Sequence, residues 1–261
     1  RPHDREASAL AAPQARRRAR RSRDVLGGGG AIHNRSMHST KARLLDAGLA
    51  MLLEHGYNDL GIQALLVATG TPKGSFYHHF EDKEDFALQV IDRYMQGVHA
   101  GLDACLGDEG HPPLDRIRRF FEMTAQHYRR EGYMGCLLGG LGQELSGVSD
   151  VFRRKVDACF SRIAARMAVC LEEARKRGDI PRDSDPPRLA SLLVDCWEGA
   201  ALRSRLRRNP APLTAMLDFY FRSAVARPGG PAPNGAARAS AGGATRARRA
   251  AKSGRAPTTG S

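Results

Sequence analysis

Apolar positions recur every three or four residues along most of the chain, which is the spacing of a helix with one buried face. The first such segment runs from Lys41 to His55, where Thr40 is an expected N-cap and Gly56 an expected C-terminal stop. A second, short helix is expected over residues 61–68. No alternating pattern of useful length indicates a β-strand. The pattern therefore predicts an all-α protein.

The stretch from Thr69 to Phe86 reads TGTPKGSFYHHFEDKEDF and predicts a tight turn followed by a helix of about two turns. Gly70 can adopt the conformation that such a turn needs. Thr71 is the expected cap of the short helix, and Pro72 suits its first position because the missing N–H has no helical partner there. This order of elements is that of a helix-turn-helix.

The short helix has one apolar face and one face rich in hydrogen-bond donors. Phe76 and Phe80 are four residues apart, so they share the inner face. Asp82 is expected to cap the next helix, and Lys83 lies at the N-terminus of that helix, facing the same way as the donors. A short helix that presents donors after a tight turn suits entry into the major groove of DNA. The donors are Lys73, Ser75, Tyr77, His78 and His79.

The rest of the pattern brings the expected total to about nine helices. The last two expose more apolar surface than one helical layer can hide, so two copies are expected to pack into a four-helix bundle, forming a homodimer. The further segments are Glu84–Leu106, Leu114–Arg130, a glycine-rich segment starting at Cys136, Ser149–Gly178, Arg188–Arg208 and Leu213–Val225, with a loop over 181–187.

Four glycines stand within the twelve residues 134–145. Each glycine inside a helix costs about 1 kcal/mol relative to alanine. Several so close together imply that a neighbour approaches the backbone closely. That neighbour is either a packed helix or a ligand.

The net charge of +13 lies in the two tails. Residues 1–39 hold nine Arg against three acids, and residues 226–261 hold six Arg and one Lys with no acid, while residues 40–225 are neutral. Both tails have the composition of disordered segments, and their arginines would attract phosphate non-specifically. The alternative is that a GC-rich genome encodes Arg, Ala and Gly by default. A further hypothesis is that translation starts at Met37, with residues 1–36 an over-extended reading frame.

Composition also argues against several classes of protein. No apolar run is long enough to span a membrane, and no signal peptide is recognisable. Five cysteines without a CxxC pair make a disulfide framework or a zinc site a poor interpretation, so a reduced, cytoplasmic setting without cofactor or metal is expected. Cys159, Cys170 and Cys196 lie on apolar faces and are expected in the core.

The segment around the short helix resembles the DNA-binding segment of the TetR/AcrR family of transcriptional regulators. The matching residues are Gly70, Lys73, Gly74, Phe76, Tyr77, His79, Phe80, Lys83 and Glu84. The resemblance implies a helix-turn-helix domain over residues 40–86 and a helical effector-binding and dimerisation domain over 87–225.

The family's functions suggest a role for each matching residue. The resemblance implies that Lys73 and Gly74 approach bases, that Tyr77 and His79 contact phosphate, and that Lys83 binds phosphate from the next helix. Ser75 and His78 are secondary candidates. It also implies a homodimeric repressor that reads a palindromic operator and releases it when a small molecule binds.

Gly135–Gly139 with Gln143–Leu145, and Trp197–Ala200, resemble the NemR/AcuR-like subgroup, which responds to electrophiles or to acrylate. There, the cysteine matching Cys136 lies in the effector region, and Arg205 stands where a reactive lysine is found. The resemblance implies an effector site of Cys136, Gln143, Trp197, Glu198 and Arg205. A thiolate is the reactive species, and the expected helix N-terminus would lower the pKa of Cys136.

The sequence leaves alternatives open for two residues and for the class of protein. Cys136 is either a sensor or a small buried hydrophobe. Trp197 either lines a pocket or anchors the dimer interface. Two other classes of protein compete with a regulator: an enzyme that uses the Cys136 thiol, and a protein that coats nucleic acid through its Arg-rich tails.

Overall fold

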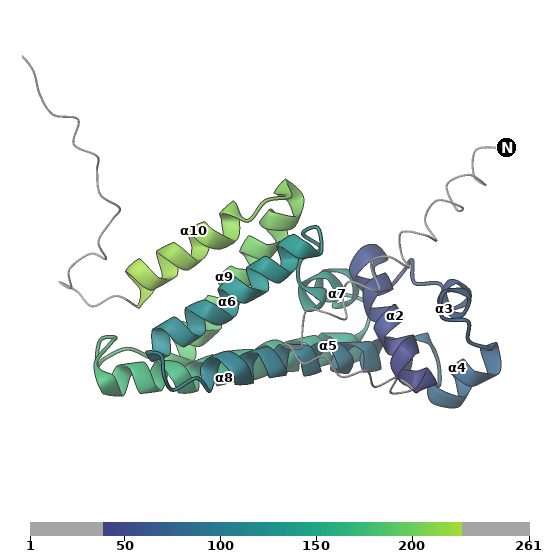
Figure 1. Ribbon diagram of the computed structural model, residues 1–261, viewed down its shortest axis with the longest axis horizontal. Helices are drawn as coiled ribbons and strands as arrows, with labels where there is room; N and C mark the ends of the chain where they lie inside the picture. Colours follow the sequence, from purple (N-terminus) through teal and green to yellow (C-terminus); the bar gives the residue numbers. More distant parts are fainter. Residues whose placement is uncertain (1–38, 226–261) are drawn as a thin grey trace, which may run out of the picture. The chain divides into compact units, whose positions relative to one another are not determined.

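A computed structural model describes residues 39–225 of the chain, and in that range it contains helices and no strand (Figure 1). The all-α prediction of about nine helices is confirmed. The predictions for the tails and for Met37 lie outside the described residues. The elements are α2 (Thr40–His55), α3 (Ile62–Thr69), α4 (Lys73–His79), α5 (Lys83–Leu106), α6 (Pro113–Arg130), α7 (Leu137–Leu145), α8 (Asp150–Arg177), α9 (Pro186–Arg207), α10 (Ala211–Phe219) and the π-helical turn η2 (Tyr220–Ala224).

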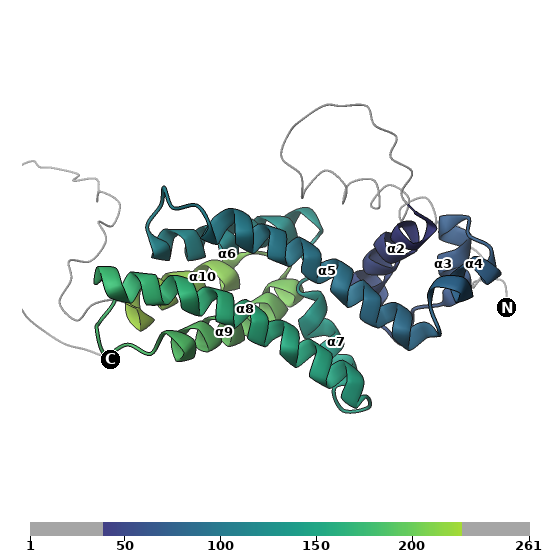
Figure 2. The same ribbon diagram turned by 90° about the horizontal axis from the view of Figure 1, so that it is seen from below.

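Helices α2, α3 and α4 form a compact group, called the reading head below, at one end of α5 (Figures 1 and 2). Its centre is a cluster of three aromatic rings: Phe76 lies 5.1 Å from Phe80 and 5.3 Å from Phe86, centroid to centroid. All three side chains are buried. The cluster fixes α4 against the start of α5.

Helices α6, α8, α9 and α10 bury a second core, in which α8 and α9 lie side by side (Figure 2). Trp197 of α9 is 4% exposed and packs against Phe121 and Tyr128 of α6, with ring centroids 4.7 Å and 6.0 Å away. The indole is therefore inside the protomer. The hypothesis that Trp197 anchors a dimer interface is wrong, because the side chain points away from the surface.

The apolar core of the reading head continues into the glycine-rich helix. The residues that α7 contributes, Leu137, Leu138, Leu141 and Leu145, are all buried in the same cluster as the reading head, together with Phe152 at the start of α8. Side chains thus pack across the domain boundary predicted after residue 86, and that boundary stays a prediction.

Two helix starts differ from the sequence-based expectation. Ser39 caps α2, with its hydroxyl accepting from the Ala42 N–H, and Thr40 is already helical. Helix α9 starts at Pro186 because Asp185 accepts the Arg188 N–H at 3.1 Å. A proline is tolerated in the first helical turn, where its missing N–H has no partner.

Candidate DNA interface and effector site

The turn that positions α4 is left-handed at Gly70, with φ 62° and ψ 33°. The Thr71 N–H then donates to the Leu66 carbonyl at 3.0 Å, and Pro72 occupies the N-cap position of α4. Thr71 does not cap the helix: its side chain is buried, and its hydroxyl has no partner among the described residues. That expectation is wrong because the side chain turns into the apolar core.

The two faces of α4 divide as predicted. Phe76 and Phe80 are 0% and 1% exposed, whereas Tyr77 is 51% exposed. Because the inner face is fixed by aromatic packing, the outer face is free to contact another molecule. The donors fall into two groups: Lys73, Tyr77 and His78 are exposed, and Ser75 and His79 are half-buried.

Gly74 is exposed on the outer face of α4, and a Cβ placed on it would meet no atom within 4 Å. Its backbone is helical, so neither packing nor a positive φ requires glycine here. A glycine inside a helix nevertheless costs about 1 kcal/mol relative to alanine. The described part of the chain therefore gives no packing or backbone reason for glycine at this position.

The next helix starts at the predicted cap. Asp82 accepts the Asp85 N–H at 2.8 Å, and the Asp85 carboxylate in turn accepts the Glu81 N–H at 3.0 Å. Lys83 has contacts within the reading head: its ammonium donates to the Asn58 carbonyl at 3.3 Å and lies 4.6 Å from the centre of the Tyr57 ring. The side chain is thus held over the turn between α2 and α3.

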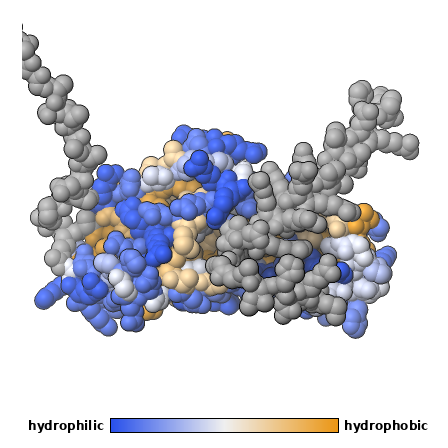
Figure 3. Space-filling model, viewed as in Figure 1, coloured by the Kyte–Doolittle hydropathy of each residue, from blue (hydrophilic) through white to orange (hydrophobic). Residues whose placement is uncertain are grey.

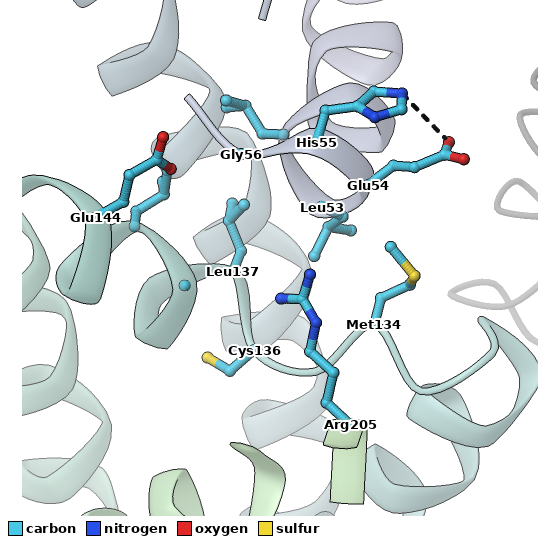
Figure 4. Close-up of a pocket in the computed structure, with 12 residues that line it drawn as sticks. Leu53, Glu54, His55, Gly56, Met134, Cys136, Leu137, Glu144 and Arg205 are labelled. Atoms are coloured by element: carbon cyan, nitrogen blue, oxygen red, sulfur yellow. Dashed lines mark ion pairs between the residues drawn. The ribbon is translucent and has the colours of Figure 1, made fainter. Parts of the chain in front are cut away.

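A pocket of about 180 Å³ lies between the C-terminal end of α2, the segment leading into α7, and α9 (Figure 4). Arg205 reaches into it from α9, near Cys136 and Met134. Within residues 39–225, Arg205 forms no ion pair. The lining residues are Leu52, Leu53, Glu54, His55, Gly56, Met134, Cys136, Leu137, Gly140, Leu141, Glu144 and Arg205.

Cys136 is the N-cap residue of α7, and its Sγ lies 3.7 Å from the Tyr94 hydroxyl. The expectation that the helix start lowers the pKa of this thiol is wrong for this structure. Burial, and then the nearby Glu198 carboxyl, raise the pKa to about 12, although the Gly139 N–H acts in the opposite direction. At neutral pH, the thiol in this conformation is almost entirely protonated.

Glu198 lies close to the backbone of α7, since a Cβ on Gly139 would collide with its carboxyl group. Burial raises the pKa of Glu198 to about 7, and a hydrogen bond with Cys136 lowers it in part. The close approach predicted from the glycine-rich stretch is thus found at Gly139, where the neighbour is a side chain, whereas a Cβ at Gly142 would make only an ordinary contact with Val156 of α8.

The remaining predicted effector residues lie elsewhere. Gln143 is exposed and, like the buried Trp197, does not line the pocket. The core assignment holds for Cys159 and Cys170 and is wrong for Cys196, which is exposed because it lies one position away from the buried stripe of α9. The structure thus brings together Cys136, Glu198 and Arg205 around the start of α7.

Sequence reasoning missed Glu144, near the end of α7. Its carboxylate accepts the Tyr57 N–H at 2.8 Å and the Asn58 N–H at 2.6 Å. The partners are 87 and 86 residues away in the chain, so no local pattern could have indicated the contact.

In residues 39–225, no cluster of three or more His, Cys, Asp or Glu side chains is arranged to hold a metal ion. None of the helices in that range is long and apolar enough to cross a membrane.

A short helix with outward donors, set by a left-handed turn on a three-helix unit, defines a helix-turn-helix DNA-binding protein with an attached helical domain. The family model described as bacterial regulatory proteins, tetR family, matches residues 44–90, and the tetracyclin repressor-like C-terminal domain matches residues 113–220. The chain belongs to the TetR family of transcriptional regulators. Since these families and the relatives below are regulators, the enzyme alternative is excluded.

Three relatives illustrate the similarity. The transcriptional regulator AcuR of Cereibacter sphaeroides is 38% identical, over 70% of this chain and 84% of that one. The repressor DhaR of Mycobacterium sp. is 33% identical, over 70% of this chain and 91% of that one. The crystal structure of reduced Escherichia coli NemR covers 74% of this chain and 100% of its own, with 29% identity and a TM-score of 0.67. The predicted resemblance to the NemR/AcuR-like subgroup is confirmed.

Proposed function

We propose that this protein is a homodimeric, cytoplasmic repressor that binds a palindromic operator through α4 of each protomer and releases it when a small molecule binds. The observation that carries the DNA-binding part is the outer face of α4, where donors surround a glycine that has open space around it. Two relatives, DhaR and NemR, are named as repressors, which supports repression as the direction of control.

The donors of α4 divide into two proposed roles. Lys73 and Gly74 approach base edges, while Tyr77, His79 and Lys83 contact phosphates, with Ser75 and His78 as secondary contacts. Phosphate contacts position a protein on DNA without reading its sequence. We therefore expect Tyr77→Ala and Lys83→Ala to weaken binding to operator and to random duplex by the same factor. A gel-shift series in which only operator binding falls would contradict these roles.

Dimerisation is supported by an apolar stripe left exposed on α9. Leu192 is 45% exposed and Leu206 is 65% exposed, and Cys196 lies between them at helical spacing. Phe219 at the end of α10 is 68% exposed. Figure 3 shows apolar surface near α10 among hydrophilic side chains, whereas α9 lies behind α6 in that view. A second copy packed on these helices would remove this surface from water.

The pocket beside α7 is the proposed effector site. Its volume of about 180 Å³ is small, since pockets for drug-sized ligands span roughly 300–1,000 Å³. The Arg205 guanidinium at its wall suits a carboxylate, and the Cys136 thiol lies at the same wall. A small unsaturated carboxylate such as acrylate, or another small electrophile, matches this combination. The high pKa of Cys136 favours non-covalent binding as the first step.

The test is gel-shift binding to the DNA upstream of the gene, with acrylate, N-ethylmaleimide and hypochlorite added in turn to wild type and to Cys136→Ser. Serine is also a good N-cap, so α7 should form normally in this variant. We expect release by acrylate in both proteins. Release that disappears in Cys136→Ser would instead establish covalent sensing by the thiol. We expect the operator to lie in this upstream DNA, so the absence of any gel shift with wild-type protein would contradict that location.

A further inference from the structure

One carboxylate of α7 makes two hydrogen bonds to the backbone of the reading head. Glu144 of α7 accepts hydrogen bonds from two consecutive backbone N–H groups, those of Tyr57 and Asn58, in the turn between α2 and α3. The turn leaves room for this group: Gly56 has φ +78°, and a Cβ there would lie 2.7 Å from the Glu144 Oε2. We call these two bonds the Glu144 latch.

The other side of the same turn holds a proposed DNA contact. The Asn58 carbonyl accepts from the Lys83 ammonium at 3.3 Å, and the Tyr57 ring lies 4.6 Å below that ammonium. Two consecutive residues of the turn, Tyr57 and Asn58, thus contact Glu144 through their N–H groups and Lys83 through the Asn58 carbonyl and the Tyr57 ring. A displacement of Glu144 would change the position of the peptide that holds Lys83.

The effector pocket extends along α7, because Cys136 at the N-terminal end and Glu144 near the C-terminal end both line it. Cys136 is the N-cap of α7 and lines the pocket together with Arg205 (Figure 4). Glu198 of α9 does not line the pocket but lies against Gly139 in the first turn of α7. The helix between the two ends is only nine residues long, and its leucines are buried. Because a packed helix shifts as a body and does not deform continuously, a change at one end reaches the other.

We propose that Glu144 is the positioning residue that couples the effector pocket to the reading head: a ligand that moves the start of α7 changes the Glu144 latch, and with it the turn that holds Lys83. The carboxylate bonds are charge-assisted, which makes them stronger than neutral hydrogen bonds. The role of the pocket and of Lys83 rests on the proposed function, whereas the link between α7 and the turn does not.

The first experiment measures coupling. Operator affinity is determined by fluorescence anisotropy on a duplex selected from a random library by wild-type protein, before and after addition of acrylate or N-ethylmaleimide. Allosteric coupling in proteins is typically about 5–150-fold, so we expect a loss in that range for wild type. In Glu144→Gln the loss should fall below about twofold, while affinity without effector stays within about threefold of wild type. Because Glu144 also lines the pocket, effector binding to the free variant is measured by calorimetry and should be unchanged, since a loss of binding there would contradict a role in coupling alone. Gln143→Ala, the exposed neighbour on α7, is the matched control and should behave as wild type. An effector-induced loss of operator affinity in Glu144→Gln as large as that in wild type would overturn the proposal.

The second experiment needs neither effector nor DNA. Gly139→Ala places a methyl group against Glu198 at the start of α7, whereas Gly142→Ala, the control, meets only Val156 at 3.5 Å. In otherwise wild-type protein, we expect Gly139→Ala to speed hydrogen exchange at the Tyr57 and Asn58 amides by about fivefold or more. In protein that also carries Glu144→Gln, the same substitution should speed this exchange by less than about twofold. If Gly139→Ala changes the exchange rates equally in the two backgrounds, or in neither, the proposed coupling through Glu144 is wrong. If neither acrylate nor N-ethylmaleimide releases operator from wild type, the proposed effector class is wrong. The hydrogen-exchange result then tests the coupling through Glu144 by itself.

Discussion

Replacing Gly74 by alanine separates the stability of α4 from its contact with DNA. The added Cβ meets no atom of the described chain within 4 Å, so it introduces no clash in the free protein. Alanine is favoured over glycine inside a helix by about 1 kcal/mol. For a folded unit of this size, that corresponds to a rise in melting temperature of about 2–4 °C. The free protein should therefore become more stable.

Operator binding should change in the opposite direction. If a base or phosphate lies at van der Waals distance from Gly74, a methyl group there forces α4 away from the groove and weakens its neighbouring contacts. We expect a loss of at least tenfold in operator affinity, equivalent to about 1.4 kcal/mol. Fluorescence anisotropy and thermal unfolding on the same samples measure both effects.

Gly147→Ala is the matched control for this experiment. Gly147 is exposed, lacks a positive φ, and also has open space where a Cβ would be, but it lies in the turn after α7. Its replacement should raise stability without changing operator affinity. A Gly74→Ala protein that is more stable and binds operator as tightly as wild type would refute the proposed close approach of DNA.

Three further predictions follow from buried or exposed groups. Because the pKa of Glu198 is raised from 4.5 to about 7 in the folded protein, the free energy of unfolding should fall by up to about 3 kcal/mol as pH rises from 4.5 through 7. Glu198→Gln should abolish this pH dependence in thermal unfolding scans at pH 5–8, and an unchanged pH dependence would contradict the raised pKa of Glu198. Leu206→Glu should dissociate the dimer in sedimentation velocity experiments, whereas Val148→Glu, at another exposed apolar position, should leave it intact; two unchanged dimers would argue against the α9 stripe. Thr71→Val removes a buried hydroxyl that has no hydrogen-bond partner within residues 39–225, and it should raise the free energy of unfolding by about 1 kcal/mol. A lower melting temperature in thermal unfolding would contradict this prediction.

The reading head was predictable because its determinants are local. The Asp82 cap, the left-handed Gly70 and the aromatic pair on α4 each depend on residues within a few positions of one another. The errors at Thr40 and Thr71 have different causes. Ser39 and Thr40 are adjacent hydroxyl residues that can both serve as caps, and Ser39 does so. The Thr71 side chain is buried in the core, so Pro72 occupies the N-cap position of α4 without a side-chain cap.

The effector region was less predictable because its properties depend on neighbours distant in sequence. The sequence placed Cys136 at a helix start, where a thiol pKa is lowered, but the opposing effects of burial and of Glu198 come from packing against α9. The Glu144 contact likewise joins residues more than eighty positions apart. Helical periodicity also could not distinguish a core position from a dimer contact, which is why Cys196 was assigned to the core.

The shared apolar cluster of the reading head, α7 and the start of α8 limits how far this regulator is modular. A chimera joined after residue 86 would replace the α7 leucines in the apolar cluster that they share with residues of the reading head such as Leu52. Transplanting the operator specificity of this protein onto another sensor therefore requires either carrying α7 and the first turns of α8 along, or exchanging only the outward side chains of α4. For an ancestor of this chain, the second route changes the DNA sequence that is read while leaving the core intact.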